Sequence, residues 1–264
     1  MPKSKALLWS IRHPANRFTS YLFGTMHTND GRAFFQKDLV ISKIDQCNIY
    51  AAEMSLDQIS GSQTHNPTIL LPKGQTIQQY YSTRKYAKIR KRILLHTGID
   101  IHSMRFYRPV IISNIIMDAI LQKNMTKNLD LFLWEYAQQA NKEMMGIETY
   151  HEQLQLMDSI PLDYQFKALQ SLALHFSNHK KQLQKSFLAY QDKNIWKLYH
   201  ITQKGTNKMR NLMIYKRNAI MADRIAFIAL DNSGFFAIGA SHLAGAKGVL
   251  RYLKHQGFLL KPIE

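Results

Sequence analysis

The chain has few of the sequence features that give disulfides, interdomain linkers or transmembrane helices. Its single cysteine, Cys47, cannot form a disulfide within the chain, and it precedes an apolar segment, so we expect a small buried side chain rather than a reactive thiol. The longest apolar stretch, Val110–Leu121, is broken by Asn114 and Asp118, so we expect no transmembrane helix. Proline- or glycine-rich linkers, low-complexity tracts and repeats of solenoid period are also missing from the sequence.

The beginning of the chain lacks the pattern of a secretory signal. The apolar run Ala6–Trp9 is far too short for the hydrophobic part of such a signal. We therefore expect a cytoplasmic protein, or a periplasmic or exported one if a leader has been removed. The 264 residues are enough to bury a substantial core, and we expect one domain over residues 1–264.

Acidic residues are scarce relative to basic ones. Asp and Glu number 18 against 35 Lys and Arg, which gives a formal net charge of +17. The basic residues concentrate in Arg84–Arg92, in Lys180–Lys185 and between Lys193 and Arg217. Such a surface attracts acidic proteins, anionic lipid or nucleic acid, although it is also typical of a solvated helix face. The sequence has no zinc-finger cysteines and no RNA-binding aromatic motif, so specific nucleic-acid binding is disfavoured. Attraction of an acidic peptide or macromolecule is the less specific hypothesis that the same charge supports.

Two short phrases repeat near opposite ends of the chain, Gly24-Thr25-Met26-His27 and Gly239-Ala240-Ser241-His242. Each follows an apolar run, which is typical of a buried strand that ends in a glycine turn. A parallel sheet would bring both histidines to its carboxyl edge, where open α/β folds bind their ligands. Neutral imidazole is a common metal ligand and acid or base near neutral pH. A single G-x-x-H is common in proteins, so a purely structural role for the two phrases stays an alternative.

Two further predicted strands end in glutamates. The segment Asn48–Ala52 leads to Glu53, and the weaker candidate Glu143–Ile147 leads to Glu148. Two imidazoles with carboxylates form a ligand set for zinc or another divalent ion with a position open for water. The ion would lower the pKa of that water, and one carboxylate would act as general base.

The remaining sequence is mostly helical in pattern. Residues of about 76–133 and 153–210 show apolar positions near the 3.6-residue period and predict helical insertions. We therefore expect an α/β fold with a small, mostly parallel sheet flanked by helices, the insertions forming a wall or lid over its carboxyl edge. Further predicted elements are strands at Leu7–Arg12 and Phe258–Pro262, the latter at a sheet edge, and helices at Phe34–Ile44, Leu129–Ala140, Asn211–Leu230 and Val249–His255. The stretch Gln165–Tyr199 is also predicted to be helical, with an interruption at the polar residues Gln191–Asn194.

Several blocks, in this order and spacing, resemble the TraB/PrgY/GumN family, and the resemblance covers nearly the whole chain. The blocks are Ser20–His27; Ala52-Glu53-Met54; Leu129–Leu133 with Ala137; Gly146–Thr149 with Glu152-Gln153-Leu154; Arg217-Asn218 with Met221-Ala222; and Ile238–Leu243 with Gly245, Gly248–Leu250, Leu253 and Gly257. One departure is Ser241, where the family pattern has Ala or Gly, and a small hydroxyl fits such a turn.

The resemblance implies an α/β fold related to the wider EreA/ChaN-like group. In TIKI-like members the G-x-x-H histidines and the acidic residue after the second strand are associated with metal-dependent peptide cleavage. Carried over, these residues are His27, Glu53 and His242, which would bind manganese, cobalt or zinc. Glu148 matches a family position that would act as base or as a further ligand. Other members are linked to peptide-pheromone shutdown, polysaccharide loci or haem binding, so the family does not fix one substrate.

The resemblance also implies that Arg217 and Asn218 face the same cleft and contact substrate. The leading hypothesis is a metal-dependent hydrolase, a peptidase of the TraB/TIKI type, with Glu53 and Glu148 as catalytic carboxylates and a peptide or protein substrate. The alternatives are a non-catalytic protein that captures a peptide, haem or another ligand in the same cleft, and a basic scaffold that docks on an acidic partner or nucleic acid.

Overall fold

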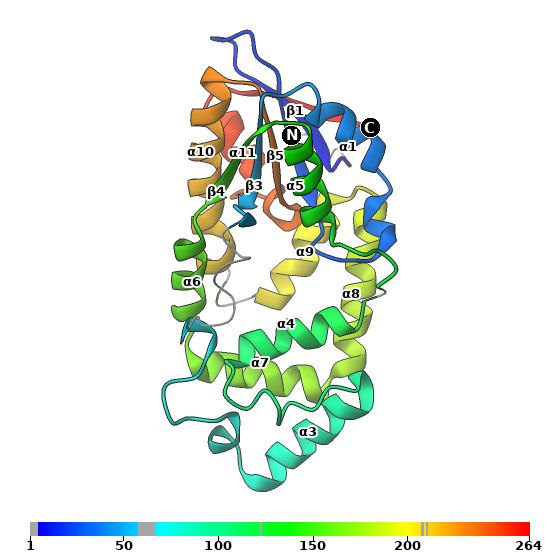
Figure 1. Ribbon diagram of the computed structural model, residues 1–264, viewed down its shortest axis with the longest axis vertical. Coiled ribbons are helices and arrows are strands. Elements are labelled where there is room, and N and C mark those ends of the chain that lie inside the picture. Colours follow the sequence, from blue (N-terminus) through cyan, green and yellow to red (C-terminus); the bar gives the residue numbers. More distant parts are fainter. Residues whose placement is uncertain (1–4, 58–66, 122, 207–208, 210) are drawn as a thin grey trace. The chain divides into compact units, whose positions relative to one another are not determined.

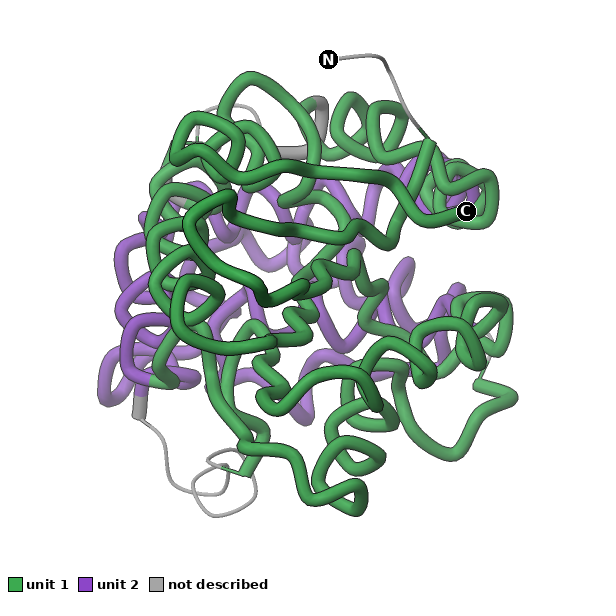
Figure 2. Tube along the Cα trace, turned by 90° about the horizontal axis from the view of Figure 1, so that it is seen from above, with its two compact units in different colours: residues 1–59, 123–150, 185–264 green, residues 60–122, 151–184 purple. Residues whose placement is uncertain are grey.

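The computed structural model describes residues 5–57, 67–121, 123–206, 209 and 211–264. The chain divides into two compact units, coloured separately in Figure 2. The first unit comprises residues 1–59, 123–150 and 185–264, and the second comprises residues 60–122 and 151–184. The expectation of one domain over 1–264 stays a prediction.

The first unit is built on a mixed sheet in the order β4-β3-β5-β2-β1-β6 (Figure 1). The four strands β4, β3, β5 and β2 run parallel, whereas β1 is antiparallel to both β2 and β6. This architecture confirms the predicted α/β fold with a mostly parallel sheet. The strands are β1 (Leu8–Arg12), β2 (Ser20–Thr25), β3 (Ile49–Met54), β4 (Glu143–Glu148), β5 (Gly234–Gly239) and β6 (Leu259–Ile263).

Burial explains the order of the strands. Every residue of β2 is buried, and β5 is buried up to Gly239, as expected for interior strands of a parallel sheet that is covered on both faces. β6 is largely exposed and contains Pro262, which lies opposite Trp9 of β1. Because proline cannot donate a ladder hydrogen bond, this strand lies at the edge of the sheet, as predicted.

Helices cover both faces of this sheet (Figure 1). α1 (Lys37–Ile44) and α5 (Leu129–Gln139) pack together on one side, and α10 (Arg217–Asp231) and α11 (Val249–His255) on the other. α9 (Ile195–Thr206) also belongs to this unit. The side chain of Asn128 caps α5 by accepting the backbone N–H of Leu131, which replaces a hydrogen bond that the first turn lacks. The predicted helix Val249–His255 is confirmed with the same bounds.

Aromatic side chains form the centre of the first core. Tyr50 of β3 stacks on Phe235 of β5 at a centroid distance of 5.8 Å and meets Trp134 of α5 edge-on at 6.1 Å. Cys47 is buried beside them in the same core, as predicted. Burial raises the pKa of its thiol to about 12, which makes it unreactive at neutral pH.

The second unit has a separate helical core. It contains α3 (Thr83–Thr97), α4 (Pro109–Ala119), α7 (Leu162–Leu174) and α6 (Tyr150–Asp158) except for the first residue of α6. α8 (Phe176–Gln191) begins here and continues into the first unit. The apolar residues that form this core include Ile77, Ile89, Ile93, Ile112, Ile116, Phe166 and Leu169.

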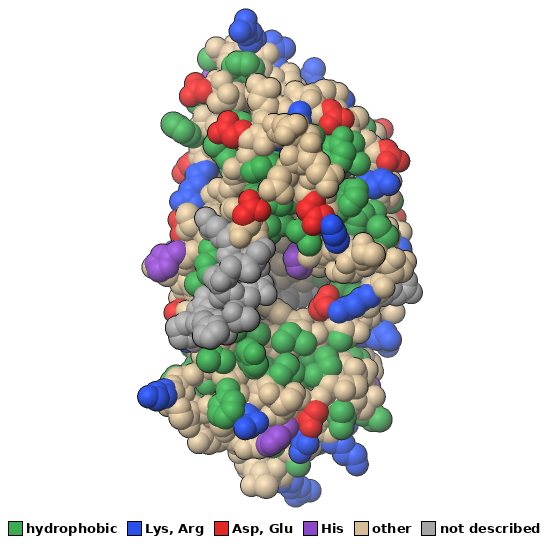
Figure 3. All heavy atoms as spheres, in the orientation of Figure 1, with side chains coloured by type: hydrophobic (Ala, Val, Ile, Leu, Met, Phe, Trp, Pro, Cys, Tyr) green, Lys and Arg blue, Asp and Glu red, His purple; other side chains and the backbone are tan. Residues whose placement is uncertain are grey.

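The basic segment Arg84–Arg92 forms the solvent side of α3. Tyr86, Ile89 and Ile93 of this helix are buried, whereas the basic residues around them are exposed or partly exposed. On the face of the molecule shown in Figure 3, Lys and Arg side chains are scattered among acidic and polar ones rather than gathered in one patch. The segment therefore matches the alternative of a solvated helix face.

Three sequence-based element predictions need correction. The predicted helix Phe34–Ile44 begins instead with a 3-10 turn at Gly31–Phe34, and α1 starts at Lys37. In the predicted stretch Gln165–Tyr199 the interruption at Gln191–Asn194 is confirmed between α8 and α9, but the chain also breaks at His175 between α7 and α8. The predicted helix Asn211–Leu230 starts with a π-helical segment, Asn211–Lys216, before α10.

Only some of the predicted insertions fall in the second unit. Residues 76–122 and 153–184 do so, whereas residues 123–133 and 185–210 belong to the first unit. Among the described residues, no helix combines the length and the apolar character needed to cross a membrane.

Candidate active site

The parallel strands bring the predicted strand ends to one edge of the sheet. Thr25 at the end of β2 pairs with Gly239 at the end of β5, and Met54 of β3 pairs with Glu148 of β4. The two G-x-x-H phrases also pack closely on each other. A Cβ added at Gly24 would lie 2.6 Å from Leu243 Cδ1 and 3.0 Å from Ala240 Cα, so glycine permits this approach.

Glu53 links the ends of β3 and β5. Its Oε2 accepts a hydrogen bond from the backbone N–H of Gly239 at 3.1 Å, and its Oε1 accepts one from Arg217 Nη2. Burial alone would raise the pKa of this carboxyl group. Three groups outweigh burial and lower the pKa to about 2: His242, which is protonated at the acidic pH where Glu53 titrates, the Arg217 guanidinium and the Gly239 N–H. Glu53 is therefore ionised at any physiological pH.

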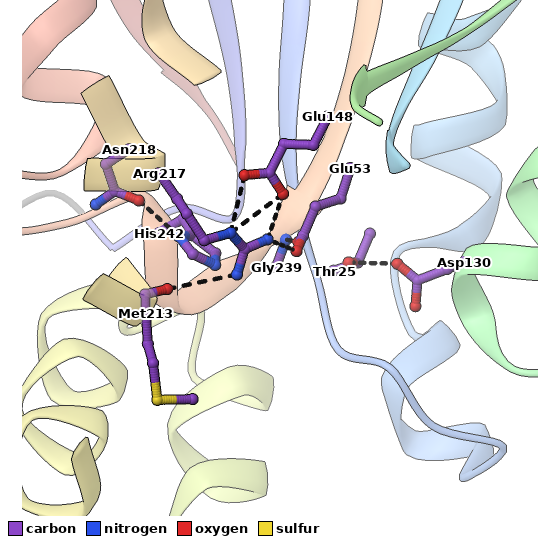
Figure 4. A network of polar contacts seen from close by, with 9 residues as sticks. All are labelled: Thr25, Glu53, Asp130, Glu148, Met213, Arg217, Asn218, Gly239 and His242. Carbon is purple, nitrogen blue, oxygen red and sulfur yellow. Dashed lines mark hydrogen bonds and ion pairs between the residues drawn. The ribbon is translucent and has the colours of Figure 1, made fainter. Parts of the chain in front are cut away.

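Arg217 lies between two carboxylates (Figure 4). Its Nε donates to Glu148 Oε1 at 2.9 Å, and its Nη2 donates to Glu148 Oε2 at 2.6 Å as well as to Glu53. The Glu148 side chain is only 5% exposed and that of Arg217 16%. Burial by itself lowers the pKa of the guanidinium, but the two carboxylates more than compensate and raise it. The three side chains form one buried ionic network.

Local backbone structure positions Arg217 for this network. It is the first residue of α10 and follows directly on the π-helical segment Asn211–Lys216. A π-helical segment winds wider than an α-helix, and such segments are frequent at functional sites. Arg217 Nη1 also donates a long hydrogen bond, 3.4 Å, to the Met213 carbonyl of that segment.

His242 is buried and is oriented by Asn218. Asn218 Nδ2 donates to the Lys247 carbonyl at 2.6 Å, so its Oδ1 faces the imidazole and accepts from His242 Nδ1, also at 2.6 Å. This assigns the proton to Nδ1 and leaves the lone pair on Nε2. Burial lowers the pKa of His242 to about 4, although Glu53 opposes the shift, so the imidazole is neutral at pH 7.

His27 is exposed at the end of the first G-x-x-H phrase. Its side chain is 78% exposed, and its Nδ1 lies 3.2 Å from Asp130 Oδ2. The other oxygen of Asp130 accepts the hydroxyl of Thr25 at 2.6 Å (Figure 4). The structure thus brings Glu53, Glu148, Arg217, Asn218 and His242 together, and it pairs His27 with Asp130 at the end of β2.

Two features of the site were not predicted as functional from the sequence. In the sequence analysis Asp130 enters only as part of the family-like block Leu129–Leu133. The one signal it gives is its place in the first turn of α5, a typical position for an acidic residue. The backbone N–H of Gly239 is a donor that no side-chain pattern reveals, since it depends on the register of β3 and β5.

The donor set suits a divalent ion only in part. Two donors are appropriate. His242 offers a neutral imidazole with its lone pair on Nε2 and is held through Nδ1 by Asn218, and Glu53 offers an ionised carboxylate. Both carboxylates, however, are bonded to Arg217, and His27 interacts with Asp130. Within the described part of the chain, no three His, Cys, Asp or Glu side chains are grouped so that they would hold a metal ion.

Comparison with known proteins decides the family. The profile of the TraB/PrgY/gumN family matches residues 7–262. The chain belongs to the TraB/PrgY/gumN family. This TraB-family chain is 24% identical to Metalloprotease TIKI2 of Danio rerio, over 96% of the chain and 60% of that protein. It is 21% identical to Metalloprotease TIKI1 of Homo sapiens, over 96% of the chain and 61% of that protein.

The TraB-family chain thus spans about 60% of the length of these curated relatives. No solved structure matches it. The names of these relatives describe them as metalloproteases.

Proposed function

We propose that this chain is a hydrolase that cleaves peptide bonds with the help of a divalent metal ion, and that its substrate is a peptide or protein. One observation carries the proposal: an imidazole and two carboxylates from three neighbouring strand ends gather with a buried arginine at the carboxyl edge of the sheet. Similarity to proteins named metalloproteases supports the reaction class.

We assign the metal ligands to His242, Glu53 and His27, and the metal to manganese, cobalt or zinc. A bound ion of this kind supplies a water of lowered pKa and polarises a peptide carbonyl. His242 and Glu53 have the charge states that ligation needs at pH 7, since the imidazole is neutral and the carboxylate ionised. His27 contacts Asp130 through Nδ1, so it would act as the third donor through Nε2.

Glu148 is the carboxylate that we assign as general base, with Glu53 as the second catalytic carboxylate. Glu148 accepts three hydrogen bonds from Arg217, one at Oε1 and two at Oε2, which fix its direction. It would accept a proton at a remaining lone pair of Oε1, the oxygen with the single bond from Arg217.

Arg217 and Asn218 complete the proposed machinery. Arg217 Nη1 makes one long bond within the described residues, to Met213, so it retains capacity to stabilise a developing oxyanion or to bind a substrate carboxylate. Asn218 is 1% exposed and engages both His242 and Lys247, which suits an orienting role toward the imidazole.

Cleavage of a degenerate peptide library, followed by mass spectrometry, tests this function. The protein is assayed with manganese, cobalt, zinc or a chelator, beside Glu53→Gln and the matched control Glu135→Gln, whose partner is the exposed Lys127. We expect metal-dependent cleavage that Glu53→Gln reduces at least about 100-fold and the control leaves unchanged. Equal cleavage by both variants, or none by folded wild type under any condition, would contradict the proposal.

The second candidate is a non-catalytic protein that binds a peptide, haem or another ligand at the same edge. The observation that favours it is the pairing of both carboxylates with Arg217, because an ion-paired carboxylate is a poorer metal ligand and base. Saturable ligand binding without turnover, in the presence of each metal, would assign the chain to this function.

A further inference from the structure

A cavity lies in the first unit, and none of the residues of the candidate active site lines it. Its volume is about 620 Å³, within the range of small-molecule sites in proteins. Its walls come from β1, from the start of α9, from the turn that follows His242 and from α11. These segments all belong to one unit, so the cavity is formed within a single compact body.

Two tryptophans and aliphatic side chains make the cavity apolar. Trp9 is 6% exposed, and its indole N–H donates to the Ala6 carbonyl at 3.0 Å, so the polar atom of this ring is already satisfied. Trp196 packs partly buried against the core, and Leu243 and Leu250 complete the apolar wall. Such a surface favours an apolar body with planar or extended shape.

The turn that lines the cavity is conformationally fixed. Gly245 has a φ of +104°, which L side chains rarely adopt, and a Cβ at this position would lie 2.4 Å from the ring of Tyr199. The backbone at Gly245 therefore approaches Tyr199 as only glycine allows. A preformed wall of this kind reduces the ordering cost of binding a ligand.

Two basic residues line the cavity together with this apolar surface. Arg251 and His255 are four residues apart on α11, so they lie on one face of the helix, and both are exposed. Within the described residues, neither side chain makes an ion pair or a side-chain hydrogen bond. A cation without an acidic partner beside an apolar cavity favours a ligand that carries a negative charge at one end.

We propose that this cavity binds an amphipathic organic anion, with its apolar body between Trp9 and Trp196 and its carboxylate on Arg251. The ligand class is an acyl-chain or aromatic carboxylic acid. This site is separate from the proposed hydrolytic centre, and the proposal does not depend on that activity.

Tryptophan fluorescence tests the proposal directly, because two of the three tryptophans of the chain line the cavity. The full-length protein is titrated with decanoate and with 1-naphthaleneacetate, and in parallel with the uncharged decanol and 1-naphthaleneacetamide. We expect saturable changes with at least one anion and a Kd for its uncharged analogue about fivefold to tenfold higher. Binding of decanoate alone would define an acyl ligand, and binding of 1-naphthaleneacetate alone an aromatic one.

Variants separate the cavity from the general basic surface. Arg251→Gln removes the charge, and Ala246→Trp fills the cavity from an exposed position of the lining turn. Lys254→Gln is the matched control, since Lys254 is exposed on the same helix and does not line the cavity. We expect about fivefold to tenfold weaker binding for Arg251→Gln, no saturable binding for Ala246→Trp and no change for Lys254→Gln. An absence of saturable binding in wild type, or equal affinity in all folded variants, would overturn the proposal.

Discussion

Replacing Arg217 with methionine removes the cation that bridges Glu53 and Glu148 while keeping an apolar stem of similar length. Removing one partner of a buried ion pair typically costs about 3–5 kcal/mol, because the remaining charge stays buried without compensation. Glu148 is 5% exposed and Glu53 29%, so water partly screens only the second carboxylate. We therefore expect Arg217→Met to lower the free energy of unfolding at pH 7.5 by about 3 kcal/mol.

The pH dependence of this loss gives a sharper test. In Arg217→Met the guanidinium that lowers the pKa of Glu53 is gone and Glu148 stays close by, so the pKa of Glu53 rises in the folded state. A group whose folded pKa is raised stabilises the folded protein as pH falls, so the loss relative to wild type should shrink to about 1–2 kcal/mol at pH 5. Adding Glu148→Gln removes the repulsion and should recover part of the stability at pH 7.5.

Urea unfolding followed by tryptophan fluorescence measures these differences. Trp9, Trp134 and Trp196 all belong to the first unit, as does Arg217, so the signal reports unfolding of the unit that is changed. Lys127→Met is the control, because it breaks an exposed pair in the same unit and should cost less than about 1 kcal/mol. A loss below 1 kcal/mol in Arg217→Met, or the same loss at pH 7.5 and pH 5, would refute a buried ionic network.

Three further predictions concern stability and reactivity. Burial lowers the pKa of His242 from 6.5 to about 4, so as pH falls the unfolded state binds the proton before the folded state does. When pH is lowered from 7 to 4, the metal-free protein should therefore lose about 3 kcal/mol of unfolding free energy. His242→Gln should remove most of that slope, and an unchanged slope would contradict the assignment. Gly24→Ala places a Cβ 2.6 Å from Leu243 Cδ1 and should lower stability by about 1–3 kcal/mol in thermal unfolding, whereas unaltered stability would show that the turn yields. Cys47 should resist a thiol reagent in the native protein at pH 8 and react at once in urea, and rapid native labelling would contradict its burial.

The strands and their ends are predictable because local composition determines them. Short apolar runs that lead into glycine or glutamate mark β2, β3 and β5, and a parallel arrangement follows from the helices between them. The glutamates at positions 53 and 148 could therefore be placed at one edge from the sequence. The break at His175 was less visible than the polar interruption at Gln191–Asn194, because His175 interrupts the helical pattern without proline, glycine or a run of polar residues.

The pairing of charges at the site could not be predicted from the sequence. Arg217 lies 164 residues from Glu53 and 69 from Glu148, and only the fold shows that it lies between their carboxylates. The same holds for His27, whose strand-end position was predictable while its contact with Asp130 of α5 was not. Side-chain partners at a sheet edge depend on helix placement and register, which periodicity does not encode.

The most direct test of the proposed metal centre is the metal content of the protein itself. Wild type, His242→Gln and the control His151→Gln, whose histidine lies in α6 of the second unit, are dialysed with manganese, cobalt or zinc and then against buffer before elemental analysis. We expect about one ion per chain in wild type and in the control, and loss of that ion in His242→Gln. Metal-free wild type under all three conditions, or an ion that His242→Gln retains, would contradict a metal centre at the carboxyl edge of the sheet.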